Sequence, residues 1–274
     1  MKSDRSESRL GVLLAFSCLF LATAPFTDAT AVSTLEPIKA FGVPAPGANP
    51  RAELIQGTDG ALYGTAEHGG YGIAGTVFKL NPDGTGLTVL WNFTNPTDGG
   101  SPTAGLIQGT DGALYGVAYR GGSSDAGTVF KLNPDGTGFT VLKTLVPSAT
   151  GANPFGSLIQ GTDGALYGTA SYGGSSNAGT LFKLNTDGTG FTVLKYFDNG
   201  ADGGYPYTRL IQGTDGALYG TASQGGTSGA GTVFKMNTDG TGFAVLQNFD
   251  YSTTGGSLPS KSRRKTVPRP ASPP

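Results

Sequence analysis

Between about residues 51 and 258 the chain consists of short runs in which apolar and polar residues alternate, separated by glycine-rich segments. Alternation with a period of two over four to eight residues predicts β-strands. Asp-Gly pairs between the runs predict tight turns, because both residues tolerate a positive φ. In the first unit the pattern predicts strands at Glu53 to Gln56, Ala61 to Ala66, Thr76 to Asn81 and Leu87 to Phe93.

This unit recurs four times at a spacing of 52 residues. The segment Leu-Ile-Gln-Gly-Thr-Asp-Gly-Ala-Leu-Tyr-Gly is unchanged at Leu54 to Gly64, Leu106 to Gly116, Leu158 to Gly168 and Leu210 to Gly220. A fixed period of about 50 residues with four strands per unit is typical of β-propeller blades. We therefore predict an all-β fold, a β-propeller of four four-stranded blades at about residues 51–102, 103–154, 155–206 and 207–258. No segment of helical period is found after the first thirty residues.

The two ends of the repeat array are not those expected of a simple closed ring of four blades. Residues 35–41 are in register with Leu87 to Phe93, which predicts an extra strand before the first blade. After about Ser257 the sequence leaves the repeat pattern for a basic, proline-rich tail at 261–274, which we expect to be disordered. The array at 32–260 is thus either a four-bladed ring or a longer propeller that has been cut short.

The first 31 residues have the layout of a signal peptide. Lys2, Arg5 and Arg9 precede an apolar run from Gly11 to Ala24 that is too short to span a bilayer comfortably. We predict cleavage before Val32 and a secreted or cell-surface protein without a transmembrane segment in the mature chain. Cleavage would also remove Cys18, the only cysteine.

Charge limits the class of partner. Between Val32 and Ser260 there are ten Lys or Arg against sixteen Asp or Glu. A mildly acidic module argues against nucleic-acid binding.

Residues that recur in every repeat are interpreted first as structural. We expect the aspartates at the Asp59 position to cap turns and the tyrosines at the Tyr63 position to pack between blades with their hydroxyls on backbone partners. Lysines at the Lys79 position are expected to form a solvated face. The oxygen-rich segments 81–85 and 198–202 resemble a calcium loop only faintly, since they lack the bidentate glutamate and its spacing. We predict no cofactor, with calcium as the one open possibility.

The repeat resembles two known families. Gly69-Gly70 and the third strand running into Asn-Pro-Asp-Gly are similar to a kelch blade, although kelch's tryptophan after that strand is missing. The closer resemblance is to the GloVer tandem repeat of bacterial "choice-of-anchor" proteins, carried by residues 59–65, Gly69-Gly70 and residues 75–80. It covers about residues 35–256 and implies an exported, propeller-like bacterial protein of unassigned activity.

The loop between the second and third strands varies most on this constant framework, and such loops concentrate binding residues. The candidate binding residues are His68, Tyr71, Tyr119, Arg120, Asp125, Tyr172, Asn177 and Gln224. The expected function is an extracellular binding, adhesion or structural module with a glycan or a protein as its partner. The alternative is an extracellular polysaccharide hydrolase or lyase, for which the sequence contains no catalytic motif; its loose carboxylate candidates are Glu53, Glu67, Asp98, Asp125, Asp198 and Asp202.

Overall fold

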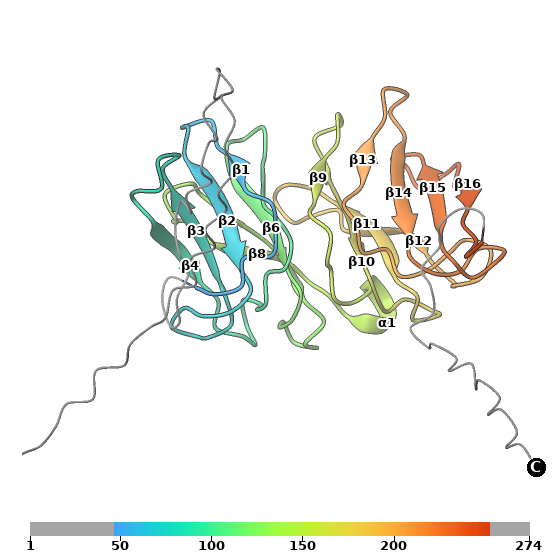
Figure 1. The fold of residues 1–274 in the computed structure, drawn as a ribbon, viewed down its shortest axis with the longest axis horizontal. Helices are drawn as coiled ribbons and strands as arrows, with labels where there is room; N and C mark the ends of the chain where they lie inside the picture. Colours follow the sequence, from blue (N-terminus) through green and yellow to red (C-terminus); the bar gives the residue numbers. More distant parts are fainter. Residues whose placement is uncertain (1–46, 253–274) are drawn as a thin grey trace, which may run out of the picture. The chain divides into compact units, whose positions relative to one another are not determined.

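The computed structural model describes residues 47–252, and these form four antiparallel sheets of four strands each, in the order of the sequence (Figure 1). Blade 1 contains β1 (Ile55–Gln56), β2 (Leu62–Ala66), β3 (Thr76–Leu80) and β4 (Thr88–Asn92). Blade 2 contains β5 (Ile107–Gln108), β6 (Leu114–Ala118), β7 (Thr128–Leu132) and β8 (Thr140–Thr144). Blade 3 contains β9 (Ile159–Gln160), β10 (Leu166–Ala170), β11 (Thr180–Leu184) and β12 (Thr192–Tyr196). Blade 4 contains β13 (Ile211–Gln212), β14 (Leu218–Ala222), β15 (Thr232–Met236) and β16 (Ala244–Asn248).

The expected all-β repeat fold is confirmed, with small differences at the strand ends. The first strand of each blade pairs over two residues only, as in Ile55 with Tyr63 and Gln56 with Leu62. The chain also forms one helical turn that the sequence did not predict, α1 (Pro147–Thr150), which begins with proline at its first position. A proline there loses no helical hydrogen bond, so one turn can form in a connection. The predicted signal peptide, the extra strand at 35–41 and the tail at 261–274 lie outside the described residues.

The turns form as the sequence predicts. In blade 1 the Asp59 carboxylate accepts the amide of Ala61 at 3.1 Å, and Gly60 has a φ of 82° that suits glycine. In the turn between the third and fourth strands, Oδ1 of Asp83 accepts both the amide and the hydroxyl of Thr85, at 2.9 and 2.7 Å. The expected turn-capping role of the recurring aspartates is therefore confirmed.

Each blade has two apolar faces because successive strand residues point to opposite sides of the sheet. We call the face at the Ile55, Tyr63 and Val77 positions the trailing face, and the face at the Leu54, Leu62 and Phe78 positions the leading face. Three apolar clusters each join the trailing face of one blade to the leading face of the next. Tyr63, Tyr115 and Tyr167 are fully buried in these seams, which confirms their expected packing role.

A recurring hydrogen bond fixes the register of each seam. The amide of Thr58 donates to Oε1 of Gln108, that of Thr110 to Gln160 and that of Thr162 to Gln212, each at 2.9 Å. The same glutamines donate through Nε2 to the carbonyl of the glycine in their own turn, as Gln108 does to Gly112. One side chain thus ties a turn to the neighbouring blade.

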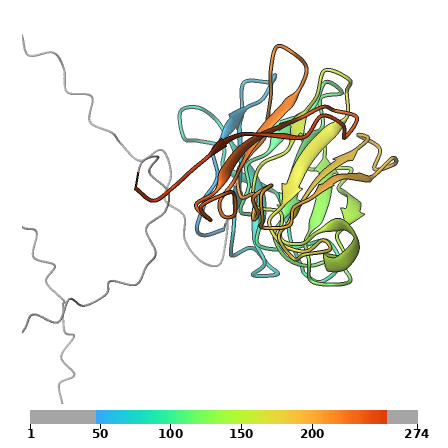
Figure 2. The ribbon, with the colours of Figure 1, turned by 90° about the vertical axis from the view of Figure 1, so that its right-hand side faces the viewer.

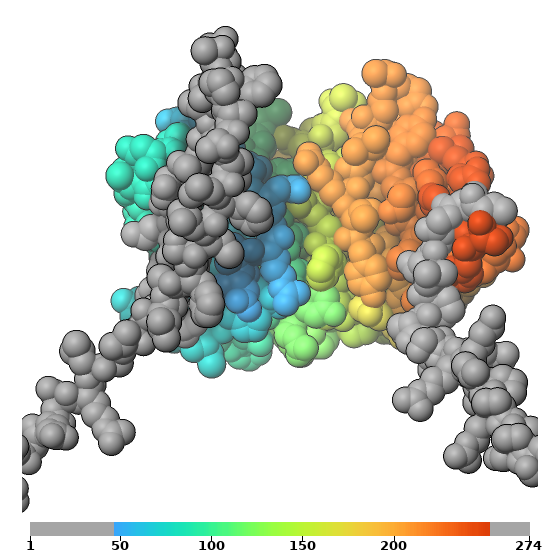
Figure 3. All heavy atoms as spheres, in the orientation of Figure 1, coloured from blue at the N-terminus to red at the C-terminus, as the bar shows by residue number. Residues whose placement is uncertain are grey.

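Blades 1 and 4 do not share an apolar cluster within residues 47–252. The fourth cluster contains residues of blade 1 alone, around Ala66 and Leu80. On the trailing face of blade 4, Ile211 is 63% exposed, whereas its counterpart Ile159 is 6% exposed. In Figure 3, atoms of blade 3 (yellow-green) are visible between those of blade 1 (blue) and blade 4 (orange).

Candidate functional site

The variable loops lie together at one end of the blades, which we call the loop end. Each loop forms a β-bridge with the connection that enters its own blade: His68 with Ala48, Arg120 with Gly100, Tyr172 with Ala152 and Gln224 with Gly204. The helical turn α1 marks this end in Figure 1, because the carbonyl of Pro147 accepts the amide of Gly174 at 2.7 Å. Four of the candidate binding residues therefore occupy equivalent positions at the same end.

A glycine is required where loop and connection cross. A Cβ added to Gly69 would lie 2.8 Å from Cα of Gly47, and one added to Gly121 would lie 2.6 Å from Cα of Gly99. This close backbone approach explains why the Gly-Gly pair is constant while its neighbours vary.

A cavity of about 250 Å³ is lined by equivalent segments of all four repeats. We call it the central cavity. Its lining comes from the three residues after the proline that enters each blade: Arg51, Ala52, Glu53, Thr103, Ala104, Gly105, Phe155, Gly156, Ser157, Tyr207, Thr208 and Arg209. The framework is constant, but the lining side chains differ from repeat to repeat.

Five aromatic side chains form a continuous cluster at this cavity. Tyr119 packs edge-on against Phe155 at 6.1 Å between ring centroids, and Phe155 packs against Tyr207 at 5.7 Å. Tyr172 contacts both Tyr207, at 6.0 Å, and Tyr205, at 5.5 Å. We call these five residues the aromatic cluster.

The cluster contains one hydroxyl pair. The hydroxyl of Tyr207 donates to that of Tyr172 at 2.6 Å. Burial raises the pKa of the Tyr207 hydroxyl, and the neighbouring hydroxyl of Tyr172 raises it further. The Tyr207 hydroxyl therefore stays protonated at physiological pH, and because the Tyr172 oxygen accepts this bond, the hydrogen of Tyr172 is not used in it.

Charged and polar groups line the central cavity or pair with residues that line it. Nε of Arg51 lies 2.6 Å from the carboxylate of Glu67, and Arg209 lies 3.9 Å from Glu53. The hydroxyl of Ser157 donates to the same Glu53 at 3.4 Å. The buried hydroxyl of Thr103 has no hydrogen-bond partner within residues 47–252. The cavity thus combines aromatic rings with a few fixed polar groups, which is the usual composition of a small-molecule site.

The candidate residues from the sequence have different environments. Tyr119 and Tyr172 belong to the aromatic cluster. Asp125 and Asn177 use a side-chain oxygen inside their own loops, accepting the amides of Gly121 at 2.8 Å and Gly173 at 3.0 Å, and both have a positive φ. The others are exposed: Tyr71 at 94%, Arg120 at 3.8 Å from Asp125, His68 at 3.6 Å from Glu67, and Gln224.

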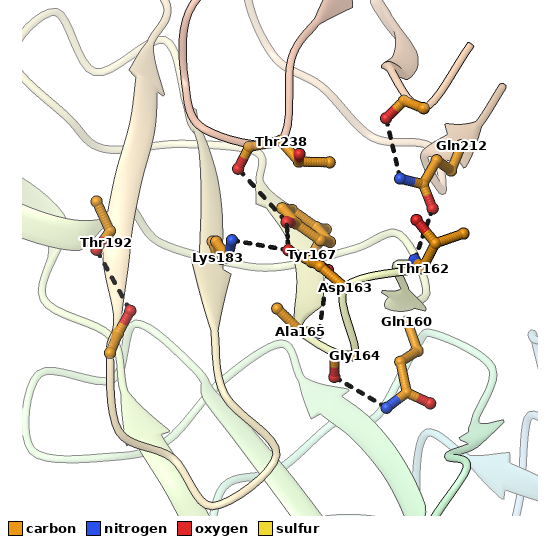
Figure 4. Close-up of polar contacts among 12 residues, drawn as sticks. Gln160, Thr162, Asp163, Gly164, Ala165, Tyr167, Lys183, Thr192, Gln212 and Thr238 are labelled. Atoms are coloured by element: carbon orange, nitrogen blue, oxygen red, sulfur yellow. Dashed lines mark hydrogen bonds and ion pairs between the residues drawn. The ribbon is translucent and has the colours of Figure 1, made fainter. Parts of the chain in front are cut away.

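Two interpretations of the constant residues are corrected. The main partners of the tyrosine hydroxyls are the turn carboxylates, as in Tyr63 to Asp59 and Tyr115 to Asp111, at 2.7 and 2.6 Å. The expected backbone partner is found among the described residues for Tyr167, whose hydroxyl also lies 3.4 Å from the carbonyl of Thr238. Lys183 does not belong to a merely solvated face, because its ammonium lies 2.8 Å from Asp163, which raises the lysine's pKa (Figure 4). The seams bring a turn of one blade against strands of the next, so these polar groups find partners there.

Oxygen ligands of the two calcium-like segments are used by the protein itself. Asp83 accepts from Thr85, Asp198 accepts from the amide of Gly200, and Asp202 is paired with Lys195. In the described part of the chain, no three His, Cys, Asp or Glu side chains gather in a way that could hold a metal ion. No helix among the described residues is long and apolar enough to cross a membrane.

A second, larger hollow of about 470 Å³ lies at the opposite end of blade 1, lined among others by Asp59, Lys79 and Asp83. These side chains recur in every repeat and form turn and seam contacts. The central cavity is the better candidate, because its lining is the part that the repeats do not share.

Sequence reasoning missed most of the cavity lining. Arg51, Phe155, Tyr207 and Arg209 are not among the candidates from the sequence, and Glu53 is expected there only as the start of the first strand and as a loose carboxylate candidate. Comparison of the repeats at the 52-residue period shows their position: the residue after the constant proline is Arg51, Thr103, Phe155 or Tyr207. That variation was visible without the structure.

The four sheets, their sequential packing and the cavity lined by all four repeats define a β-propeller repeat protein. The family model of the Gloeobacter/Verrucomicrobia repeat matches residues 25–214, and the chain belongs to that family. This confirms the GloVer resemblance. The search of curated proteins found no match.

Solved structures support the fold. The nidogen/laminin complex matches with a TM-score of 0.51 at 18% identity, over 75% of this chain and 67% of that one. The extracellular domain of the hybrid two-component system BT4673 from B. thetaiotaomicron matches with a TM-score of 0.50 at 12% identity, over 75% of this chain and 23% of that one.

Proposed function

We propose that this chain is an exported binding module that holds a carbohydrate at the central cavity, against the aromatic cluster. The observation that carries the proposal is the chain of contacting rings, Tyr119, Phe155, Tyr207 and Tyr172, beside a cavity whose lining varies on an otherwise repeated scaffold. Export is supported by the charged start and apolar run of the first 31 residues.

The chemistry of the cavity suits a sugar. Aromatic rings offer an apolar face to the C–H groups of a sugar ring, and tyrosine adds a hydroxyl for its polar edge. The hydroxyls of Thr103 and Tyr172, with the Arg51 and Glu53 side chains, supply donors and acceptors around the rings. Because the volume of about 250 Å³ is slightly below the ~300–1,000 Å³ of sites for drug-sized ligands, the site suits one terminal sugar unit rather than a long chain segment.

The enzymatic alternative can be tested on two carboxylates: Glu53, which lines the cavity, and Glu67, which pairs with the lining residue Arg51. Glu53 and Glu67 each lie beside an arginine, at 3.9 and 2.6 Å. The other candidates are used elsewhere; Asp98, for example, is buried and accepts from Trp91, Thr94 and Asn95. A glycosidase would need Glu53 and Glu67 as its pair.

The test is a glycan array followed by calorimetry on the best ligand, with Tyr207→Ala and Tyr71→Ala as matched variants. Removing the Tyr207 ring should weaken binding at least about tenfold, equivalent to about 1.4 kcal/mol, because it lines the cavity. Tyr71→Ala should leave affinity unchanged, since that ring is 94% exposed on a loop. An empty array, or equal losses for both variants, would refute the cavity as the site.

Cleavage of the bound glycan distinguishes an enzyme from a binding module. If the best glycan is cleaved, and Glu53→Gln and Glu67→Gln each abolish cleavage while binding persists, the hydrolase or lyase alternative replaces the binding module. If no product forms, the binding module stands.

A further inference from the structure

We propose that Tyr205 forms a second sugar subsite beside the central cavity. The ligand is then an oligosaccharide whose terminal unit enters the cavity and whose next unit lies against the Tyr205 ring. This inference rests on the carbohydrate binding proposed above. Tyr205 follows the β-bridge of Gly204 with Gln224 at the loop end, where α1 lies at the bottom of Figure 2.

The backbone of Tyr205 has a positive φ of 56°. The equivalent residues of the other blades, Asn49, Ser101 and Asn153, have almost the same φ, at 56°, 51° and 56°. Asparagine is enriched in this left-handed conformation, whereas a bulky side chain there is an outlier. Among the four blades, only blade 4 has a bulky residue at this strained position.

Hydrogen bonds from neighbouring segments hold this conformation. The amide of Tyr205 donates to the carbonyl of Ala178 in blade 3 at 2.7 Å, and its carbonyl accepts the amide and the hydroxyl of Ser223 at 3.3 and 3.0 Å. The amides of Ser101 and Asn153 donate to the preceding blade in the same way, each at 2.7 Å. The repeat therefore imposes the conformation, and a tyrosine is not needed to form it.

The side chain at this position has a different role in blade 4. Nδ2 of Asn153 donates to the carbonyl of Tyr119 at 3.0 Å and so ties the connection to a variable loop. Within residues 47–252 the side chain of Tyr205 makes no hydrogen bond, and its half-buried ring packs edge-on against Tyr172 at 5.5 Å between centroids. Strained residues persist where surrounding contacts fix the backbone, and they concentrate at ligand sites. Blade 4 thus has an aromatic ring in place of a structural hydrogen bond.

Tyr205 continues the row of aromatic rings beyond the cavity. Tyr207 lines the cavity, and Tyr172 contacts both Tyr207, at 6.0 Å, and Tyr205, at 5.5 Å, but Tyr205 is not part of the lining. A volume of about 250 Å³ accommodates one sugar unit, so the rest of an oligosaccharide must leave the cavity. The half-buried ring of Tyr205 offers an apolar surface to the C–H groups of the next unit.

The test compares the terminal disaccharide and the terminal monosaccharide of the glycan that binds best on the array. Calorimetry on the unchanged protein should give an affinity about three- to tenfold higher for the disaccharide, the range expected for one aromatic contact. Tyr205→Asn should remove this advantage and leave the affinity for the monosaccharide unchanged. Tyr205→Phe keeps the ring and should keep the advantage.

Asparagine is the suitable replacement because Asn49 and Asn153 have the same φ in the same repeat. Tyr205→Ser, with the serine that blade 2 has at this position, is a second variant that removes the ring, and thermal melts check that both variants fold. The matched control is Ile73→Asn, which also replaces a bulky residue at a positive φ, of 52°. Ile73 is 74% exposed and lies outside the aromatic cluster, so both affinities should stay unchanged.

Three outcomes would overturn the second subsite. If the advantage of the disaccharide survives Tyr205→Asn while Tyr207→Ala weakens binding, the cavity is the whole site and the proposed function stands. If Tyr205→Asn weakens the binding of both sugars equally, Tyr205 acts only through its contact with Tyr172. If the array shows no bound glycan, the proposed function fails, and the subsite fails with it.

Discussion

The tyrosine that recurs in every blade allows the contribution of a seam hydrogen bond to be measured. In Tyr115→Phe only the hydroxyl is lost, so the ring still fills the seam between blades 2 and 3. The hydroxyl donates to Oδ2 of Asp111 at 2.6 Å, and the ring is fully buried. Hydrogen bonds to charged groups contribute about 1.5–3 kcal/mol. Because the Asp111 carboxylate lies at an exposed turn, we expect the lower end of that range.

A free-energy loss of about 1.5 kcal/mol corresponds to a fall in Tm of roughly 3–6 °C for a domain of this size. Tyr219→Phe is the matched control, since its hydroxyl makes the same bond to Asp215 at 2.7 Å but its ring is only half-buried. Water replaces the lost partner there, so Tm should change little. Urea denaturation followed by tryptophan fluorescence and thermal melts measure both. Equal losses for the two variants would refute the argument that burial in a seam sets the value of the bond.

Three further predictions concern the dependence of stability on pH, two glycines of blade 3 and the start of the exported chain. Hydrogen bonds from Tyr63 and Tyr219 lower the pKa values of Asp59 and Asp215, so these carboxylates stabilise the fold above their unfolded pKa of about 3.9 and the contribution is lost as pH falls below about 4. Burial raises the pKa of the Tyr167 hydroxyl, so its contribution to stability is complete below about pH 10 and is lost as the pH rises further. The urea midpoint should therefore be constant between about pH 4 and pH 10. A midpoint that changes steadily across neutral pH would contradict this prediction. Gly168→Ala should lower the free energy of unfolding by about 1–3 kcal/mol, because its Cβ would lie 2.6 Å from the Phe182 ring. Gly164→Ala would have no atom within 4 Å of its Cβ, so its cost comes from its φ of 81° alone. In urea denaturation, the cost of Gly168→Ala should therefore change in a Phe182→Leu background, whereas the cost of Gly164→Ala should not. Intact-mass analysis of the exported protein should give a chain that begins at Val32, and retention of Met1 would refute the signal peptide.

The sequence predicted the variable loops and two members of the aromatic cluster, but not the lining of the central cavity. Tyr119 and Tyr172 were chosen because the loop after the second strand varies, and both contact the cavity-lining aromatics. Phe155 and Tyr207 were missed because they follow a proline in a connection. Their role in the cavity depends on four connections that meet in space although they lie 52 residues apart along the chain.

The sequence by itself determined the local structure and the repeat. Strands follow from alternation, turns from Asp-Gly pairs and blade size from the 52-residue period, all of which are short-range properties of the backbone. The tertiary structure decided which identical residues differ in environment. Ile159 and Ile211 have the same neighbours in sequence, yet one is buried by the next blade and the other is exposed. The cavity lining and the burial of the tyrosine–aspartate bonds in the seams both arise from packing between blades. The repeated sequence is the same in each blade, but the neighbour that packs against it depends on the position of the blade in the array.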